Sequence, residues 1–133
     1  MHINTVEILI ATGMDISGDD NHTLNMASYN NNLEIVQMLL AAGVDIHAND
    51  QRALWIAIKK NYPEMIKLLI ENGADIHAND QRALWIAVTN NYPKIVKILI
   101  DNGANIHAMN DKALQYAIEN NHLELVRLLS GKN

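Results

Sequence analysis

Apolar residues recur along the chain with helical spacing, and each helical stretch is short. In the segment 52–60, Leu54, Ala57 and Ile58 fall at i, i+3 and i+4, which places them on one face of a helix. The segment 63–71 carries a second, broader apolar stripe. The residues of this stripe are Met65, Ile66, Leu68, Leu69 and Ile70. Because the alternating pattern of strands is absent, the sequence predicts an all-α fold made of paired short helices.

Turn-forming residues separate the predicted helices. Asn-Tyr-Pro at 61–63 lies between the two stripes; Asn tolerates the left-handed conformation that ends a helix, and Pro suits the first position of the next one. Gly73 follows the second helix and can take the positive φ of a helix end. Residues 74–81 are too few and too polar for a third helix. They predict an extended segment with a tight turn near Asn79 and Asp80.

The same design returns every thirty residues. The stretch Asp45–Ala57 is repeated letter for letter at Asp75–Ala87. Helices this short are marginal alone in water, whereas stacked copies bury their shared apolar faces. We therefore expect a single domain, 1–133, built as a solenoid of repeats. Its parts are a half repeat at 1–12 and four repeats, at 13–42, 43–72, 73–102 and 103–133.

Several motifs of these repeats resemble a known family. The run GADIHA, followed by ALWIA and NYPKIVKILIDNGA, resembles the ankyrin repeat with its GADVNA, TPLHLAA and GHLEIVKLLL segments. The resemblance covers the whole chain, in four consecutive units that share one register. It implies an all-α ankyrin-repeat solenoid of stacked antiparallel helix pairs with short connecting turns.

The chain departs from the ankyrin pattern in three places. Its unit has thirty residues where the family has about 33, and the shortfall lies between Ala48 and Ala53. RALW at 52–55 stands where the family has Thr-Pro-Leu-His, and Asn61 replaces the usual Gly. This shortened, Asn-rich form resembles the ankyrin proteins of giant DNA viruses that infect amoebae. That resemblance implies a viral protein acting on host proteins in the host cytoplasm.

The amino-acid composition limits the cellular compartment and the classes of binding partner that we expect. The formal net charge is −5, and the densest basic cluster is the pair Lys59 and Lys60. Since chains that bind nucleic acid usually carry a basic stripe, no nucleic-acid partner is expected. The absence of cysteine excludes disulfides and thiolate zinc sites and fits a reducing, intracellular setting. The first thirteen residues hold Glu7 and no basic residue ahead of their apolar part, so we expect a cytoplasmic protein without signal peptide or membrane span.

Three histidines, His47, His77 and His107, recur in step with the repeat. Equivalent atoms of stacked helices lie roughly 8–10 Å apart, too far for ligands that share one zinc at about 2 Å each. We therefore expect no metal, and we interpret the histidines as turn-stabilising side chains. The family resemblance implies a further role, because ankyrin repeats are substrates of an asparaginyl hydroxylase that acts at the corresponding position.

The chain has no motif that indicates catalysis. It lacks a nucleophile elbow, a phosphate loop and an HExxH sequence. Asp50 and Asp80 recur once per repeat, and carboxylates at turns usually cap the adjacent helix or face solvent. An active site instead needs one convergent arrangement. We expect a protein that is not an enzyme and that uses no cofactor.

One column of the repeat is aromatic in its middle copies. It reads Asn25, Trp55, Trp85 and Gln115. The interpretation that the flanking apolar residues favour is that the two tryptophans pack between neighbouring units. The alternative is that they are aromatic anchors of a binding surface, where Trp is enriched.

The resemblance implies a non-catalytic module that binds a partner protein on its concave side. In the family, partners contact the turn tips and the ends of the inner helices. Carried onto this chain, these positions are Asn49, Asp50, Gln51, Lys59, Lys60, Asn79, Asp80, Gln81, Thr89, Asn90, Met109, Asn110, Asp111, Glu119 and Asn120. Two alternatives remain: a structural protein that self-associates through its ends, and a substrate-recruiting arm of a ubiquitin ligase. The identity of the partner does not follow from the repeats, since one scaffold hosts unrelated specificities.

We predict that the chain forms a dimer through its N-terminal end. A lone helix near Ile3–Ala11 would present apolar side chains without a first-half partner, and terminal repeats normally need a polar outer face. Two such ends would close into a twofold dimer. Light scattering over a concentration series should show a dimer mass, and a monomer mass at high micromolar concentration would contradict the prediction.

Overall fold

The computed structural model describes residues 20–131 and divides the chain into two compact units, 1–74 and 75–133. Each unit is described by itself. Every regular element within residues 20–131 is an α-helix, which confirms the predicted all-α fold. The half repeat at 1–12 and the helix expected near Ile3–Ala11 lie outside the described residues, as does the proposed N-terminal contact.

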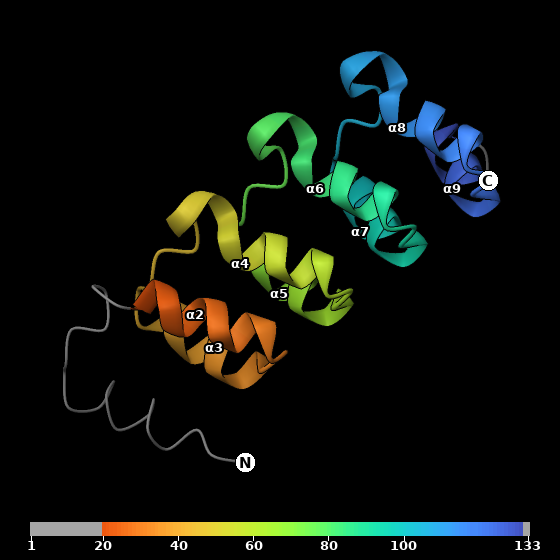
Figure 1. The fold of residues 1–133 in the computed structure, drawn as a ribbon. Helices are drawn as coiled ribbons and strands as arrows, with labels where there is room; N and C mark the ends of the chain where they lie inside the picture. Colours follow the sequence, from red (N-terminus) through yellow and green to blue (C-terminus); the bar gives the residue numbers. More distant parts are fainter. Residues whose placement is uncertain (1–19, 132–133) are drawn as a thin grey trace. The chain divides into compact units, whose positions relative to one another are not determined.

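Residues 20–74 of the first unit form two helix pairs, one packed on the other (Figure 1). The helices of this part are α2 (Asp20–Tyr29), α3 (Leu33–Ala41), α4 (Ala48–Lys59) and α5 (Pro63–Glu71). We call the first helix of each pair the inner helix. The inner helix α2 contacts α3, the second helix of its pair, and the next inner helix α4, while α3 contacts α5. This is the stacking of equivalent faces that the thirty-residue register predicts.

The second unit has the same construction. Its helices are α6 (Ala78–Thr89), α7 (Pro93–Asp101), α8 (Ala108–Glu119) and α9 (Leu123–Leu129). Inner helices α6 and α8 contact each other, and α7 contacts α9. Within the pairs, α6 contacts α7 and α8 contacts α9, so four helices enclose one core.

The core is formed by the stripes that the apolar spacing predicts. Leu54 and Ile58 are buried on α4, and Met65, Ile66 and Leu69 are buried on α5. The equivalent positions of the second unit are buried as well. They are Leu84, Val88, Ile95, Val96 and Leu99. Alanines at 57, 87 and 117 are fully buried, which lets the inner helices approach their neighbours closely.

The Asn turns between the helices of each pair adopt the predicted conformation. The four Asn residues that end the inner helices have φ values of 55°, 60°, 56° and 56°. They are Asn31, Asn61, Asn91 and Asn121. Proline occupies the first turn of both α5 and α7, where its missing N–H leaves no hydrogen bond unmade.

The first residues of α6 and α8 differ from the expected extended chain. Asn79, Asp80 and Gln81 have φ values of 54°, 55° and 65°, so they form one left-handed turn before the right-handed part of α6. Residues 109–111 repeat this turn at the start of α8, and Figure 1 shows both as curls ahead of these helices. The tight turn expected near Asn79 and Asp80 is present, but the extended segment is wrong at 79–81.

Helix length also bears on the membrane. No helix within residues 20–131 is long and apolar enough to cross a bilayer.

Gly103→Ala should destabilise the protein although there is room for the added methyl group. Gly103 has φ +93°, and a Cβ built there meets no atom within 4 Å. The expected loss of about 1 kcal/mol in the free energy of unfolding is therefore a backbone effect. Gly103→Asn is the matched control, because Asn tolerates positive φ and should lose less. Urea denaturation measures both variants, and equal losses would contradict the backbone explanation.

Candidate functional site

The recurring histidines hold the left-handed turns in place. The backbone N–H of His77 donates to Asp75 Oδ1 at 2.9 Å, and Nδ1 of the same ring lies 2.8 Å from the Gln81 amide nitrogen. His47 makes the same pair of contacts with Asp45 and Gln51, at 2.9 and 2.7 Å. The turn-stabilising role predicted for the histidines is confirmed.

The last copy of this arrangement carries a charge. His107 Nδ1 lies 2.6 Å from Asp111 Oδ1, where the earlier repeats have a glutamine amide, and its backbone N–H donates to Asn105 Oδ1 at 3.0 Å. In the part of the chain that the structure describes, no group of three or more His, Asp or Glu side chains is placed to hold a metal ion.

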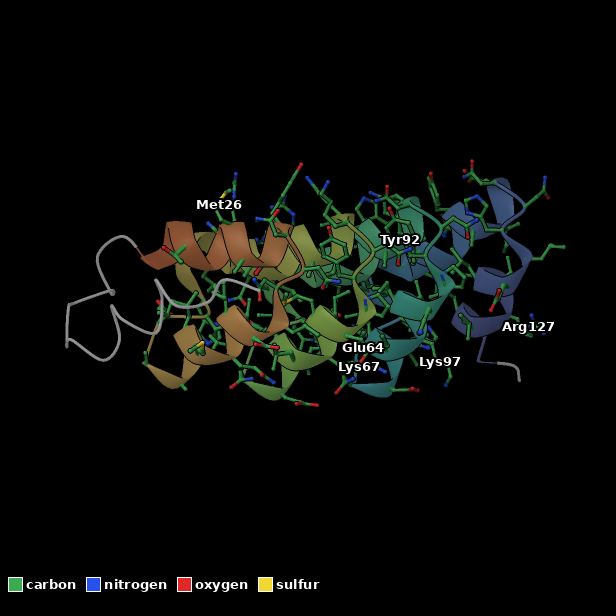
Figure 2. All side chains as sticks on the ribbon, turned by 90° about the horizontal axis from the view of Figure 1, so that it is seen from below. Met26, Glu64, Lys67, Tyr92, Lys97 and Arg127 are labelled. Atoms are coloured by element: carbon green, nitrogen blue, oxygen red, sulfur yellow. The ribbon has the colours of Figure 1, made fainter. Side chains whose placement is uncertain are left out.

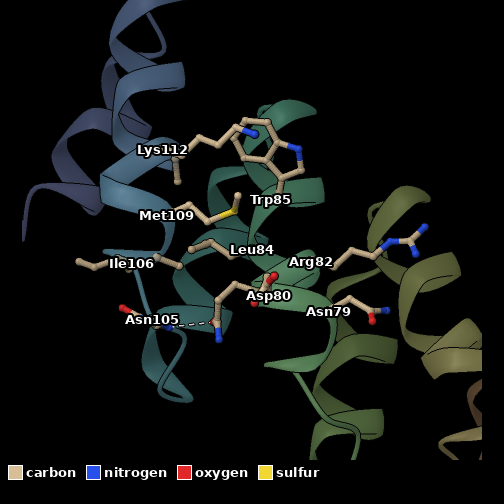
Figure 3. A pocket seen from close by; sticks show the side chains of 12 residues that line it. Asn79, Asp80, Arg82, Leu84, Trp85, Asn105, Ile106, Met109 and Lys112 are labelled. Carbon is tan, nitrogen blue, oxygen red and sulfur yellow. Dashed lines mark hydrogen bonds between the residues drawn. The ribbon is translucent and has the colours of Figure 1, made fainter.

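A recess of about 280 Å³ opens in the second unit, between the turns that begin α6 and α8 (Figure 3). Apolar side chains of both helices and of the loop between α7 and α8 line it. They are Leu84, Trp85, Ile106, Ala108, Met109 and Ala113. Polar side chains complete the lining, namely Asn79, Asp80, Gln81, Arg82, Asn105 and Lys112. The recess thus combines an apolar lining with a charged one, as in many ligand-binding hollows.

Gln81 ties the two sides of the recess together. Its Oε1 accepts a hydrogen bond from the backbone N–H of Asn105 at 3.0 Å, drawn as a dashed line in Figure 3. Because its amide nitrogen also lies beside His77, this side chain links the left-handed turn of α6 to the loop before α8. The recess is therefore a preformed hollow.

Trp85 and Trp55 have identical neighbours in sequence but different surroundings. Trp55 is 4% exposed and belongs to the core. Trp85 is half-buried and meets the Tyr116 ring at 5.4 Å in a T-shaped arrangement, while Lys112 Nζ lies 4.6 Å from the centre of its ring. Part of the Trp85 side chain thus packs between neighbouring helix pairs, and the rest of its surface lines the recess.

The first unit carries a smaller aromatic and cationic patch. Tyr29, at the end of α2, is 51% exposed, and Lys60 Nζ lies 4.2 Å from the centre of its ring. Met26, one helical turn earlier, is 48% exposed. In Figure 2, Met26 points away from the side of this unit on which Glu64 and Lys67 of α5 lie. The patch therefore belongs to the inner-helix side.

Four of the predicted site residues line the recess. They are Asn79, Asp80, Gln81 and Met109. Glu119 lines a second hollow of about 170 Å³, next to Trp85 and Tyr116. Lys59 and Lys60 are exposed in the first unit, beside the Tyr29 ring in the case of Lys60.

Other predicted residues have structural roles. Gln51 is 6% exposed and contacts His47, so it holds a turn in place and presents little surface to a partner. Asn90 and Asn120 donate side-chain hydrogen bonds to carbonyls in the last turn of their own helices. Thr89 Oγ1 does the same for Ile86 O at 3.2 Å.

The four remaining predicted residues are Asn110, Asp111, Asn49 and Asp50. Asp111 is paired with His107, and Asn110 is exposed next to it, with its carbonyl accepting from Gln115. The side chains of Asn49 and Asp50 lie outside the described residues.

The sequence analysis missed Arg82 and Lys112, the two cations of the recess. The signal was available, because Arg52, Arg82 and Lys112 occupy one column of the repeat, directly after the turn residues. The positions that correspond to partner contacts in the ankyrin family are turn tips and helix ends. They do not include the first turn after the tip in each inner helix.

The stacked helix pairs define a helical repeat protein, and its second unit has a recess beside the turns that begin α6 and α8. The sequence model of one protein family matches residues 24–110 and 54–133. This family is described as "Ankyrin repeats (3 copies)". The chain belongs to the ankyrin repeat family. No curated protein matches it significantly.

Ankyrin repeats form protein–protein interaction modules, and this chain is a module of that class. The matched family is typically non-catalytic, and no catalytic family was found. The match does not separate viral from cellular members, so the resemblance to ankyrin proteins of giant viruses stays a prediction.

Trp55→Ala should destabilise the protein more than Trp85→Ala. Removing a fully buried Trp leaves a cavity and lowers the free energy of unfolding by about 3–5 kcal/mol. Trp85 is half-buried and loses mainly its ring contact with Tyr116, so about 1–2 kcal/mol is expected. Urea denaturation followed by circular dichroism compares the two variants. Equal losses would contradict the assignment of Trp85 to the recess.

Proposed function

We propose that this chain binds a partner protein by seating a short segment of it in the recess between the starts of α6 and α8. The observation that carries the proposal is the accessible apolar surface of Trp85 and Met109 within a polar surround. Interface hot spots are enriched in Trp and lie in pockets that exclude water, with polar residues around them. The recess has this composition.

The rigidity of the recess supports the same function. A preformed site loses less conformational entropy when the partner binds than one that must first order itself. Here Gln81 joins the turn of α6 to the loop before α8, and His77 holds the same side chain from the other direction. The lining therefore keeps its shape without a partner.

The predicted site is revised accordingly. Asn79, Asp80 and Met109 stay in the proposed contact set, and Arg82 and Lys112 join it. In the first unit, Lys59 and Lys60 with Tyr29 form a separate proposed contact. Self-association and recruitment to a ubiquitin ligase stay alternatives on which no described contact bears.

Met109→Gly should weaken binding at least tenfold without destabilising the fold. Met109 has φ 54° and is 61% exposed, so glycine relieves an unfavourable conformation and removes an apolar contact of the recess. Peptides selected from a random twelve-residue library against the full chain provide the ligand. We expect at least a tenfold weaker Kd for the variant by fluorescence anisotropy, with an unchanged or higher Tm.

Leu123→Ala is the matched control. Leu123 is 76% exposed at the start of α9 and does not line the recess, so its loss removes a comparable apolar side chain elsewhere on the unit. Affinity should stay within about twofold of the parent protein. If the selected peptides bind Met109→Gly and Trp85→Ala as tightly as they bind the parent protein, the recess is ruled out as the site.

A further inference from the structure

The charges around the recess indicate what kind of segment it takes. One carboxylate, Asp80, and two cations, Arg82 and Lys112, are among the residues that line the recess. In Figure 3 Arg82 extends away from the apolar side chains, whereas Lys112 lies at the Trp85 ring. Lys112 thus places a positive charge beside the apolar lining, in a chain whose formal net charge is −5, and it favours a partner of opposite sign at that point.

Lys112 is held where it can meet such a partner. Its ammonium lies 4.6 Å from the centre of the Trp85 ring, a cation–π contact at the edge of the apolar lining. In Figure 3 its side chain extends over the Trp85 ring from α8. No ion pair joins Lys112 to a carboxylate within residues 20–131. The charge is positioned by an aromatic face and left available for a second group.

The first unit contains the same combination independently. Lys60 lies 4.2 Å from the centre of the half-exposed Tyr29 ring, and exposed Met26 is one turn away on α2. Within residues 20–131, a lysine above an aromatic ring and next to exposed apolar surface thus occurs in both units, with Lys60 directly after α4 and Lys112 in α8. Because the two contacts are built from different residues, the chance rotamer of a single side chain does not explain them.

We propose that the segment bound in the recess is an acidic peptide of the partner protein, with an apolar side chain in the hollow and a carboxylate on Lys112. This inference rests on the proposed function of the recess. Because Lys112 Nζ is 4.6 Å from the ring that lines the hollow, the carboxylate must come from close to the apolar anchor. An extended chain advances about 3.3 Å per residue, which places the acidic residue one or two positions from the anchor.

Nucleic acid is the other anionic macromolecule that uses aromatic and basic side chains, and the recess fits it less well. Single-stranded nucleic acid binds by stacking bases on open aromatic faces along a basic groove. Here Lys112 already lies over the Trp85 ring, and Asp80 adds a negative charge to the same lining. The Asp80 carboxylate would repel the phosphates of a nucleic-acid backbone.

The test uses the full chain and the twelve-residue random peptide library. Enriched peptides should carry Leu, Met or Phe with Asp or Glu one or two positions away. Lys112→Glu should weaken their binding at least tenfold, and raising the salt concentration from 0.05 to 0.5 M, about a threefold shorter screening length, should weaken the parent complex. Lys97→Glu, the same charge change on α7, should alter the affinity less than twofold.

Charge reversal separates recognition from structure. Copies of the enriched peptides with every Asp and Glu changed to Lys should fail on the parent chain and bind Lys112→Glu more tightly than the acidic originals do. A merely structural role of Lys112 would weaken both peptide sets alike. The Tm of Lys112→Glu checks that the fold is kept, since the side chain is exposed.

The remaining outcomes distinguish this inference from the proposed function. Enriched peptides without acidic residues that still lose affinity in Met109→Gly would overturn the acidic inference and leave the recess as the site. Peptides that are indifferent to Met109→Gly overturn both. Tighter binding of a single-stranded oligonucleotide than of any enriched peptide, lost in Lys112→Glu, would also overturn the acidic-peptide assignment.

Discussion

The left-handed turn at 79–81 is the constraint on which the site depends. Left-handed conformation costs roughly 1–2 kcal/mol for each residue that has a Cβ, and here three consecutive residues adopt it. Such a turn persists only where its surroundings fix it. Asp75 holds His77, His77 lies beside Gln81, and Gln81 accepts from Asn105. This chain of contacts ends at the loop that forms the far side of the recess.

The left-handed turn lies in the part of the repeat that is shorter than in the ankyrin pattern. The contact from Asp75 to His77 spans two residues and the contact from His77 to Gln81 spans four, so the whole device fits inside one thirty-residue unit. Its residues are also those that the family comparison identifies as turn tips. The stability of the turn and the position of the binding surface are therefore coupled.

Local sequence was sufficient for the helices and for most turns. The apolar spacing of 54–58 and 63–71 identifies the buried faces, and Asn61 and Gly73 each mark a helix end with positive φ. These features depend on residues within one helical turn of each other, so a single repeat contains the information. The left-handed turn was not predicted. Asn79 and Asp80 belong to residue types that tolerate positive φ, but Gln81 does not, and L-residues usually adopt this conformation singly and not three in a row.

The recess could not be predicted in the same way, and the tryptophans show why. Trp55 and Trp85 lie within identical thirteen-residue stretches, yet one is core and the other is half-buried. The environment of Trp85 depends on Lys112 and Tyr116, which are about thirty residues away in the chain. No reasoning confined to the repeated stretch can separate the two copies. The family comparison supplied the general surface, and the packing of α6 against α8 determines where that surface is hollow.

Met109 shows how far the local rules are relaxed at this place. Asn79 holds the equivalent position one repeat earlier, and Asn adopts left-handed conformation more readily than Met does. Since Met109 is 61% exposed, burial in the fold gives little in return for the less favourable backbone. A sequence that keeps an exposed apolar side chain in a strained turn breaks two local preferences at once. Such breaks are expected at functional sites, and this one lies in the lining of the recess.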